Sequence, residues 1–135
     1  MRNLKRILIV NDDPYYVNEI MDILPKEKYA VEASFNYDEG LEALERGEFD
    51  LIILDMMMEH CMGGILFARK VRQDNRYCGL PLLMTAGHEE QFNFFYPGKN
   101  INPKFFHASA IVEKPISVER LLNKVNSLLE RETWN

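Results

Sequence analysis

The sequence has no excess of positive charge, no long apolar run and only two cysteines, and each absence excludes a class of protein. Lysine and arginine total 16 against 21 aspartate and glutamate residues, a formal net charge of −5, so we expect no direct contact with nucleic acid. The apolar run at residues 7–10 is too short for a signal peptide or a membrane-spanning helix, and we expect a cytoplasmic protein without membrane contact. Cys61 and Cys78 form no paired ligand motif and are expected to be free thiols.

The chain also lacks low-complexity stretches, repeats and Gly/Ser linkers. Its 135 residues, 47% of them hydrophobic, are enough to bury one ordinary core. We therefore expect a single domain over residues 1–131, followed by a short tail at residues 132–135. The composition fits a stand-alone protein and a fragment of a longer one equally well.

Two kinds of apolar segment alternate along the chain. Short apolar runs predict strands at residues 7–10, 51–54, 82–84 and 110–112, and a loose alternation predicts another at residues 29–34. Apolar residues at helical spacing predict helices that begin at Pro14, at Asp38, after Gly63-Gly64 and at Val118. This alternation indicates an α/β fold in which right-handed helical crossovers join parallel strands. Such sheets bind ligands outside the carboxyl ends of their strands.

Polar residues follow four of the predicted strands. They are Asp12 and Asp13 after the first strand, Asp55 after the third, Thr85 after the fourth and Lys114 after the fifth. We expect all five to open onto one edge of the sheet. Three carboxylates there would repel one another unless a cation lay between them, and oxygen ligands without His or Cys favour Mg²⁺. Taken alone, the acidic pair is also typical of a helix N-cap beside a solvated charge.

Asp55 is the residue best placed for covalent chemistry. A carboxylate can act as a nucleophile toward phosphorus and form an aspartyl phosphate. Asp55 ends the most apolar strand, and Thr85 and Lys114 would supply a hydroxyl and a charge to the transferred group. Singly, Thr85 is more typical of a turn and Lys114 of a solvated surface, so only their joint placement favours a site.

The order and spacing of these residues resemble the receiver domain of two-component response regulators. The matching segments span nearly the whole chain: NDDP at 11–14, LIILDMMM at 51–58, Gly63, MTAG at 84–87 and EKP at 113–115. The resemblance implies a flavodoxin-like (CheY-like), doubly wound fold with a five-stranded parallel sheet of order 2-1-3-4-5 and helices on both faces.

The resemblance also implies a function. Asp55 would accept a phosphoryl group from a phosphohistidine on a sensor histidine kinase or a phosphotransfer protein, with Mg²⁺ as cofactor. The metal would be held by Asp12, Asp13, Asp55 and the backbone carbonyl of Met57. Thr85 and Lys114 would bind the phosphoryl group, and the peptide bond before Pro115 would be cis. The protein would be a phosphoacceptor rather than an enzyme, with no output domain in this chain, and would signal by contact with a downstream protein; homodimerisation stays open.

Three features depart from the family pattern. Glu59 stands four residues after the acceptor where the family usually has proline, and Ile111 stands where it usually has an aromatic switch residue. The third is length, because 28 residues separate Thr85 from Lys114 and make the segment 88–109 longer than usual. That segment holds six clustered aromatic residues: Phe92, Phe94, Phe95, Tyr96, Phe105 and Phe106. Their density predicts a partner surface or, equally, rings that pin a long loop onto the domain.

Two more positions are candidates for setting the lifetime of an acyl phosphate. Met57 and Gly87 lie two residues after Asp55 and Thr85, where the family controls how water reaches the phosphoryl group. We hypothesise that both residues tune the rate of dephosphorylation.

Two other functions compete with this interpretation. One is a receiver-like interaction module that works without phosphorylation, which Glu59 and Ile111 keep open. The other, with less support, is an Asp-nucleophile phosphatase of the haloacid dehalogenase type, whose second Asp is replaced here by Met57. A nucleotide-binding protein is disfavoured because no glycine-rich phosphate motif follows the first strand.

Overall fold

The computed structural model describes residues 4–56, 63–87 and 107–130. In this part of the chain five parallel strands form one sheet: β1 (Lys5–Val10), β2 (Tyr29–Ser34), β3 (Leu51–Asp55), β4 (Leu82–Ala86) and β5 (Ala110–Glu113). The strand order is β2-β1-β3-β4-β5, so the predicted fold and topology are confirmed. The order reverses between β1 and β3, which is where doubly wound folds bind ligands.

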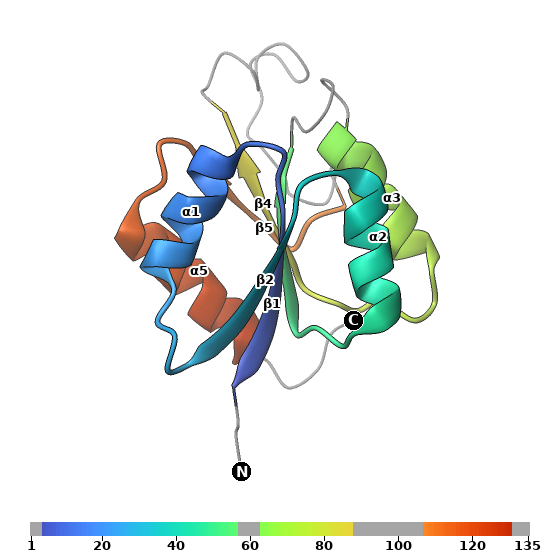
Figure 1. Cartoon of the computed structure of the whole chain (residues 1–135), viewed down its shortest axis with the longest axis horizontal. Helices are drawn as coiled ribbons and strands as arrows, with labels where there is room; N and C mark the ends of the chain where they lie inside the picture. The colour runs from blue at the N-terminus through green and yellow to red at the C-terminus, as the bar shows by residue number, and fades with distance from the viewer. Residues whose placement is uncertain (1–3, 57–62, 88–106, 131–135) are drawn as a thin grey trace.

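Helices cover both faces of the sheet (Figure 1). In the described ranges α1 (Pro14–Ile23) and α5 (Val118–Leu129) lie on one face, and α2 (Tyr37–Arg46) and α3 (Gly63–Gln73) lie on the other. The four described helices flank the two faces of the sheet, and doubly wound folds bind ligands outside the carboxyl ends of their strands.

Two apolar cores, one on each face of the sheet, hold the helices in place. The strand segments 7–10 and 51–54 are at most 1% exposed, because the central strands are covered on both faces. Val17 of α1 and Leu121 of α5 fill one core, and Phe67 of α3 fills the other. This burial fixes the ends of β1 and β3 relative to each other.

Side-chain caps determine where three of the helices begin. Asp13, Asn36 and Ser117 accept hydrogen bonds from backbone N–H groups at the starts of α1, α2 and α5. Pro14 occupies the first turn of α1, where its missing N–H costs nothing. Only residues 11–13 lie between β1 and α1, so the acidic pair is held on a short and well-defined connection.

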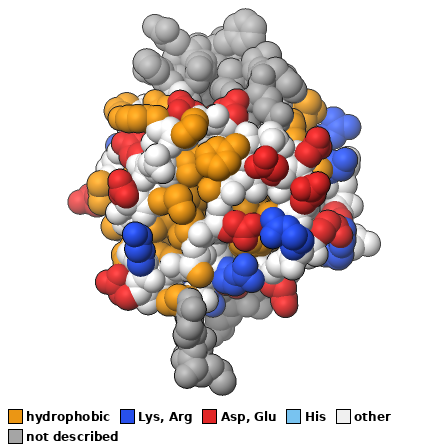
Figure 2. Space-filling view, in the orientation of Figure 1, with side chains coloured by type: hydrophobic (Ala, Val, Ile, Leu, Met, Phe, Trp, Pro, Cys, Tyr) orange, Lys and Arg blue, Asp and Glu red, His pale blue; other side chains and the backbone are white. Residues whose placement is uncertain are grey.

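The surface carries charges of both signs. On the face shown in Figure 2, Lys and Arg side chains lie among Asp and Glu side chains and not in a single basic patch. Arg46 pairs with Glu32 at 3.1 Å, and Arg76 pairs with Glu45 at 2.6 Å. Within the described residues, no helix is long and apolar enough to cross a membrane.

Candidate functional site

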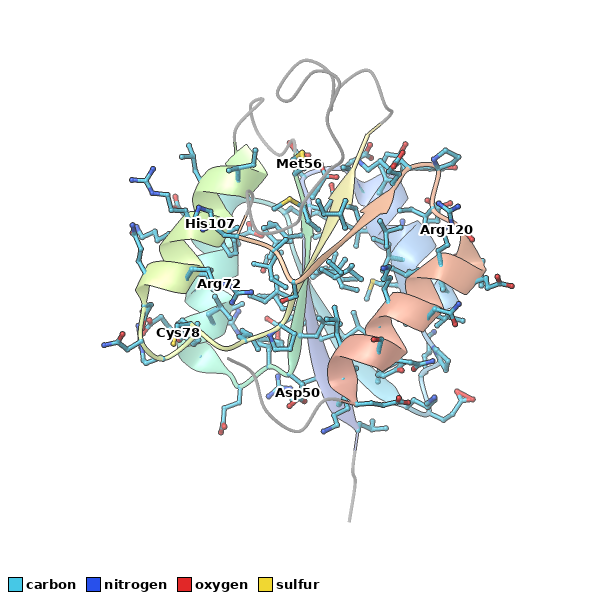
Figure 3. All side chains as sticks on the ribbon, turned by 180° about the vertical axis from the view of Figure 1, so that it is seen from behind. Asp50, Met56, Arg72, Cys78, His107 and Arg120 are labelled. Carbon is cyan, nitrogen blue, oxygen red and sulfur yellow. The ribbon has the colours of Figure 1, made fainter. Side chains whose placement is uncertain are left out.

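Asp55 lies at the edge of the sheet where β3 and β4 end together. It is the last residue of β3 and is in register with Thr85 of β4. Figure 3 labels Asp50 and Met56 at opposite ends of β3, and Met56 marks the end at which Asp55 lies. Asp55 is only 5% exposed. A carboxylate so removed from water needs a cation or hydrogen-bond donors to compensate its lost hydration.

Lys114 and Thr85 supply that compensation. The Lys114 Nζ lies 2.6 Å from Oδ1 of Asp55, and the Thr85 hydroxyl donates a hydrogen bond of 3.0 Å to the same oxygen. The Lys114 backbone N–H donates to the carbonyl of Ala86 at 2.7 Å, which extends the pairing of β4 with β5. The Lys114–Pro115 peptide bond is cis, the isomer that the resemblance implied. The structure therefore brings together three residues that stand far apart in the sequence.

The acidic pair occupies the connection between β1 and α1. The Asn11 backbone N–H donates to the carbonyl of Ser34, and its buried side chain accepts a hydrogen bond of 2.9 Å from the N–H of Asp13. Oδ1 of Asp13 accepts from the N–H of Tyr15 at 2.9 Å. Asp13 thus takes the N-cap role that the sequence left open, and both Asp12 and Asp13 are exposed to solvent.

The donor set at this edge suits a hard divalent cation. Val10 of β1 is in register with Leu54, so the exposed Asp12 and Asp13 follow a strand end that adjoins Asp55. Mg²⁺ typically takes one or two carboxylates and completes its shell with waters and phosphate oxygens. In the part of the chain that the structure describes, no three Asp, Glu, His or Cys side chains gather closely enough to hold a metal by themselves. The oxygen ligands fit Mg²⁺ by their chemistry, with waters and phosphoryl oxygens needed to complete its coordination.

Gly64 is a structural requirement of the site that the sequence analysis did not single out. Its backbone N–H donates to the carbonyl of Met56 at 2.9 Å. A Cβ atom at this position would overlap the carbonyl oxygen of Asp55 and press on that of Met56. The start of α3 can approach the end of β3 this closely only because residue 64 is glycine.

A second feature that the sequence analysis missed is the ring of Tyr16. It lies in the first turn of α1, and the Lys114 Nζ is 4.1 Å from the ring centroid. A cation at this distance from the ring is attracted by the negative potential of the π face. The spacing of apolar residues in α1 carried no signal for this contact, because it joins residues far apart in the sequence.

Several predicted residues lie outside the described ranges. These are Met57, whose carbonyl was assigned to the metal, and the six aromatic residues Phe92, Phe94, Phe95, Tyr96, Phe105 and Phe106. Gly87 is described and is buried directly after β4. The roles given to these residues stay predictions.

Comparisons with known proteins identify the family of this chain. The sequence matches the response regulator receiver domain family over residues 7–126. It is 25% identical over 129 residues to the response regulator ArlR of Staphylococcus aureus, covering 96% of this chain and 54% of the relative. The chain thus spans about half the length of the curated relatives that it matches.

Solved structures share the fold over nearly the whole chain. The chemotaxis response regulator CheY4 of Vibrio cholerae has a TM-score of 0.78 and 26% identity, covering 94% of this chain and 100% of that protein. A CheY-like receiver domain protein from Methanospirillum hungatei has a TM-score of 0.76 and 29% identity, covering 95% of each chain. With a family match that extends from β1 into α5, this chain belongs to the receiver domains of two-component response regulators.

Proposed function

We propose that Asp55 is the phosphoacceptor of this receiver domain. The observation that carries the proposal is the buried cluster at the end of β3, in which Lys114 and Thr85 both bind Oδ1 of Asp55. An ammonium and a hydroxyl that already contact the acceptor carboxylate can transfer their hydrogen bonds to phosphoryl oxygens without a large rearrangement. Such preorganised donors are the usual source of electrostatic stabilisation in group transfer.

The reaction has a simple balance of bonds. A carboxylate oxygen of Asp55 attacks the phosphorus of a phosphohistidine, the P–N bond breaks, and the imidazole keeps the electron pair and takes up a proton. The product is an acyl phosphate on Asp55 and a neutral histidine on the donor. Lys114 and Thr85 would then bind oxygens of the phosphoryl group.

We propose that Mg²⁺ binds beside Asp12, Asp13, Asp55 and the carbonyl of Met57, with waters supplying the coordination that the three carboxylates do not supply by themselves. When bound, the metal neutralises negative charge that accumulates as a phosphoryl group approaches three carboxylates. The residues of the chain contribute the fixed position of Asp55, two donors to one of its oxygens and the exposed acidic pair on the β1–α1 connection.

The partners follow from the same chemistry. We propose a sensor histidine kinase or a phosphotransfer protein as the donor, and a downstream protein that contacts the phosphorylated domain. Ile111 has no ring, so if signalling requires an aromatic switch beside Thr85, another residue reports the phosphorylated state. The segment 88–109, with its six aromatic residues, is the proposed surface for that contact.

Intact-mass spectrometry after incubation with acetyl phosphate tests the acceptor role. We expect a gain of one phosphoryl group that requires Mg²⁺ and is absent from Asp55→Asn. Asp50→Asn, at the opposite end of β3, is the matched control and should be phosphorylated like the wild type. A gain of mass that persists in Asp55→Asn would place the acceptor elsewhere. No gain under any condition would favour an interaction module that works without phosphorylation.

We further propose that Met57 and Gly87 set the lifetime of the acyl phosphate. Gly87 is buried directly after β4, two residues beyond Thr85, so a side chain at this position would change how water reaches a phosphoryl group on Asp55. We expect Gly87→Ala and Met57→Asn to change the dephosphorylation rate, measured by loss of phosphoryl mass after removal of acetyl phosphate. Unchanged rates in both variants would contradict this role.

A further inference from the structure

The ammonium of Lys114 lies between two partners of different kinds. On one side is Oδ1 of Asp55 at 2.6 Å, and on the other is the ring of Tyr16, with its centroid 4.1 Å from Nζ. The Lys114 side chain is 15% exposed. Its charge is therefore compensated by one carboxylate and one aromatic face more than by bulk water.

The ring of Tyr16 is itself held in place. It packs against the core on the α1 and α5 face of the sheet. The exposed ring of Tyr15 meets it edge to face, with centroids 5.1 Å apart and planes at 81°. Pro14 and the cap at Asp13 fix the turn of α1 that carries both rings. Tyr16 is thus a rigid neighbour of Lys114 and not a mobile surface side chain.

We propose that Tyr16 is a positioning residue for Lys114 during phosphoryl transfer, an inference that rests on the proposed function of Asp55. An aromatic face attracts the ammonium but accepts no strong hydrogen bond from it. The ring can therefore keep Lys114 at the site while its N–H groups move from Asp55 to a phosphoryl oxygen. A second carboxylate in the same place would compete with the phosphoryl group for the ammonium, and an aliphatic side chain would leave the charge without attraction.

The ring of Tyr16 and the side chain of Ile111 pack on opposite faces of the sheet. Ile111 lies against the core beneath α2 and α3, whereas Tyr16 lies against the core beneath α1 and α5. The aliphatic residue at position 111 and the aromatic residue at position 16 therefore belong to different layers. An aromatic contact to the site is present in this chain, and α1 supplies it.

The contact can be measured without metal or phosphate. Ring currents from Tyr16 should shift the ε-CH₂ protons of Lys114 upfield from those of the exposed lysines in a carbon–proton NMR spectrum, with Lys114→Arg used to assign the signal. We expect Tyr16→Phe to keep the shift and Tyr16→Leu to abolish it. A Lys114 signal that is the same in wild type and Tyr16→Leu would overturn the inference.

The role in transfer is measured by the rate of phosphorylation by acetyl phosphate with Mg²⁺. We expect Tyr16→Leu to slow the reaction about 2- to 5-fold, the rate equivalent of one partly exposed cation–π contact, and Tyr16→Phe to restore it. Urea unfolding of both variants shows whether α1 is intact. If the wild type takes up phosphate and Tyr16→Leu reacts at the same rate, the inference fails and the proposed function stands. If the wild type takes up no phosphate, both fail.

Discussion

Within the described residues two cationic side chains, Lys114 and Arg72, are partly buried, and their partners differ. Lys114 sits at the carboxyl edge of the sheet, with one carboxylate and one aromatic face as its partners. Arg72 lies in the last turn of α3 and points toward the sheet on the opposite side of the fold (Figure 3). No carboxylate pairs with Arg72 among the described residues.

Arg72 is bound by neutral oxygen atoms instead. Its guanidinium donates to the carbonyls of Leu80 at 2.6 Å, His107 at 3.1 Å and Tyr77 at 3.3 Å, and to the Ser109 hydroxyl at 3.3 Å. Partial burial of the guanidinium lowers the pKa of Arg72 from its ordinary value, because desolvation disfavours the charged form. His107 has a φ of 64°, a left-handed conformation that its carbonyl contact with Arg72 helps to hold.

The different partners of Arg72 and Lys114 indicate different roles for the two side chains. Arg72 joins the connection before β4 to the residues just before β5, and its planar fork satisfies several carbonyls at once. Moving it would break all of these bonds, so it serves as a structural brace. Among the described residues Lys114 pairs with one carboxylate and one ring that accepts no strong hydrogen bond, which is the arrangement expected of a cation that exchanges its anionic partner.

Removing the ammonium of Lys114 should have the greatest effect on the rate of phosphoryl transfer. Lys114→Met should slow phosphorylation by acetyl phosphate by about 10²- to 10³-fold, as expected for loss of a preorganised donor to the transferred group. The control is Lys124→Met, which removes an exposed lysine from α5 and should leave the rate unchanged. A Lys114→Met variant that reacts as fast as the control would show that Lys114 has no part in the transfer.

Removing the guanidinium of Arg72 should lower the free energy of unfolding and leave the rate of phosphoryl transfer unchanged. Arg72→Met leaves several carbonyls without their charged donor and should lower the free energy of unfolding by about 2–4 kcal/mol. Urea titration measures this loss, with exposed Lys70→Met in the same turn of α3 as the matched control. At a temperature where the variant is folded, its phosphorylation rate should equal that of the wild type. A slower rate in the folded variant would remove the distinction between the two cations.

A still smaller effect is expected from the hydrogen bond between Tyr29 and Asn126, which involves neither Lys114 nor Arg72. The Tyr29 hydroxyl, on a residue 6% exposed, donates to Oδ1 of Asn126 at 2.7 Å. Burial, and then the charge of Glu130, raise the pKa of Tyr29 above its ordinary value of 10.0. As pH rises, Tyr29 therefore ionises in the unfolded chain before it ionises in the folded protein. Its contribution to the free energy of unfolding is fully present below the ordinary pKa and is lost as pH rises through the raised pKa of the folded protein.

Tyr29→Phe should lower the free energy of unfolding by about 1 kcal/mol near neutral pH. In the alkaline range, the free energy of unfolding of this variant should fall less steeply with pH than that of the wild type. Urea midpoints measured across the alkaline range test both statements. The control is Tyr15→Phe, because Tyr15 is 67% exposed. An alkaline slope in Tyr29→Phe as steep as that of the wild type would mean that another group causes it.

The sequence predicted the parts of this structure that follow from local patterns. The second strand was predicted at residues 29–34 from its loose alternation of apolar and polar residues and is observed there. The third strand extends one residue further than predicted and includes Asp55, since a polar residue at a strand end gives no apolar signal. The meeting of Asp55, Thr85 and Lys114 was also predicted, because parallel strands align their carboxyl ends.

Contacts that depend on the reach of long side chains could not be predicted. The pattern of α3 places Arg72 next to the buried Val71, and by periodicity alone it belongs to the solvated face. Its partners are backbone carbonyls, which any sequence supplies. Tyr16 likewise adjoins the buried Val17, and its distance to Lys114 depends on how α1 packs on the sheet.

We propose that Asp55, and no other carboxylate at this edge of the sheet, carries the phosphoryl group. The most direct test is to phosphorylate the protein with acetyl phosphate and Mg²⁺, reduce the acyl phosphate with borohydride, and locate the resulting homoserine by tandem mass spectrometry of peptides. We expect homoserine at position 55 and unmodified Asp12 and Asp13. Homoserine at position 12 or 13, or at no position, would contradict it.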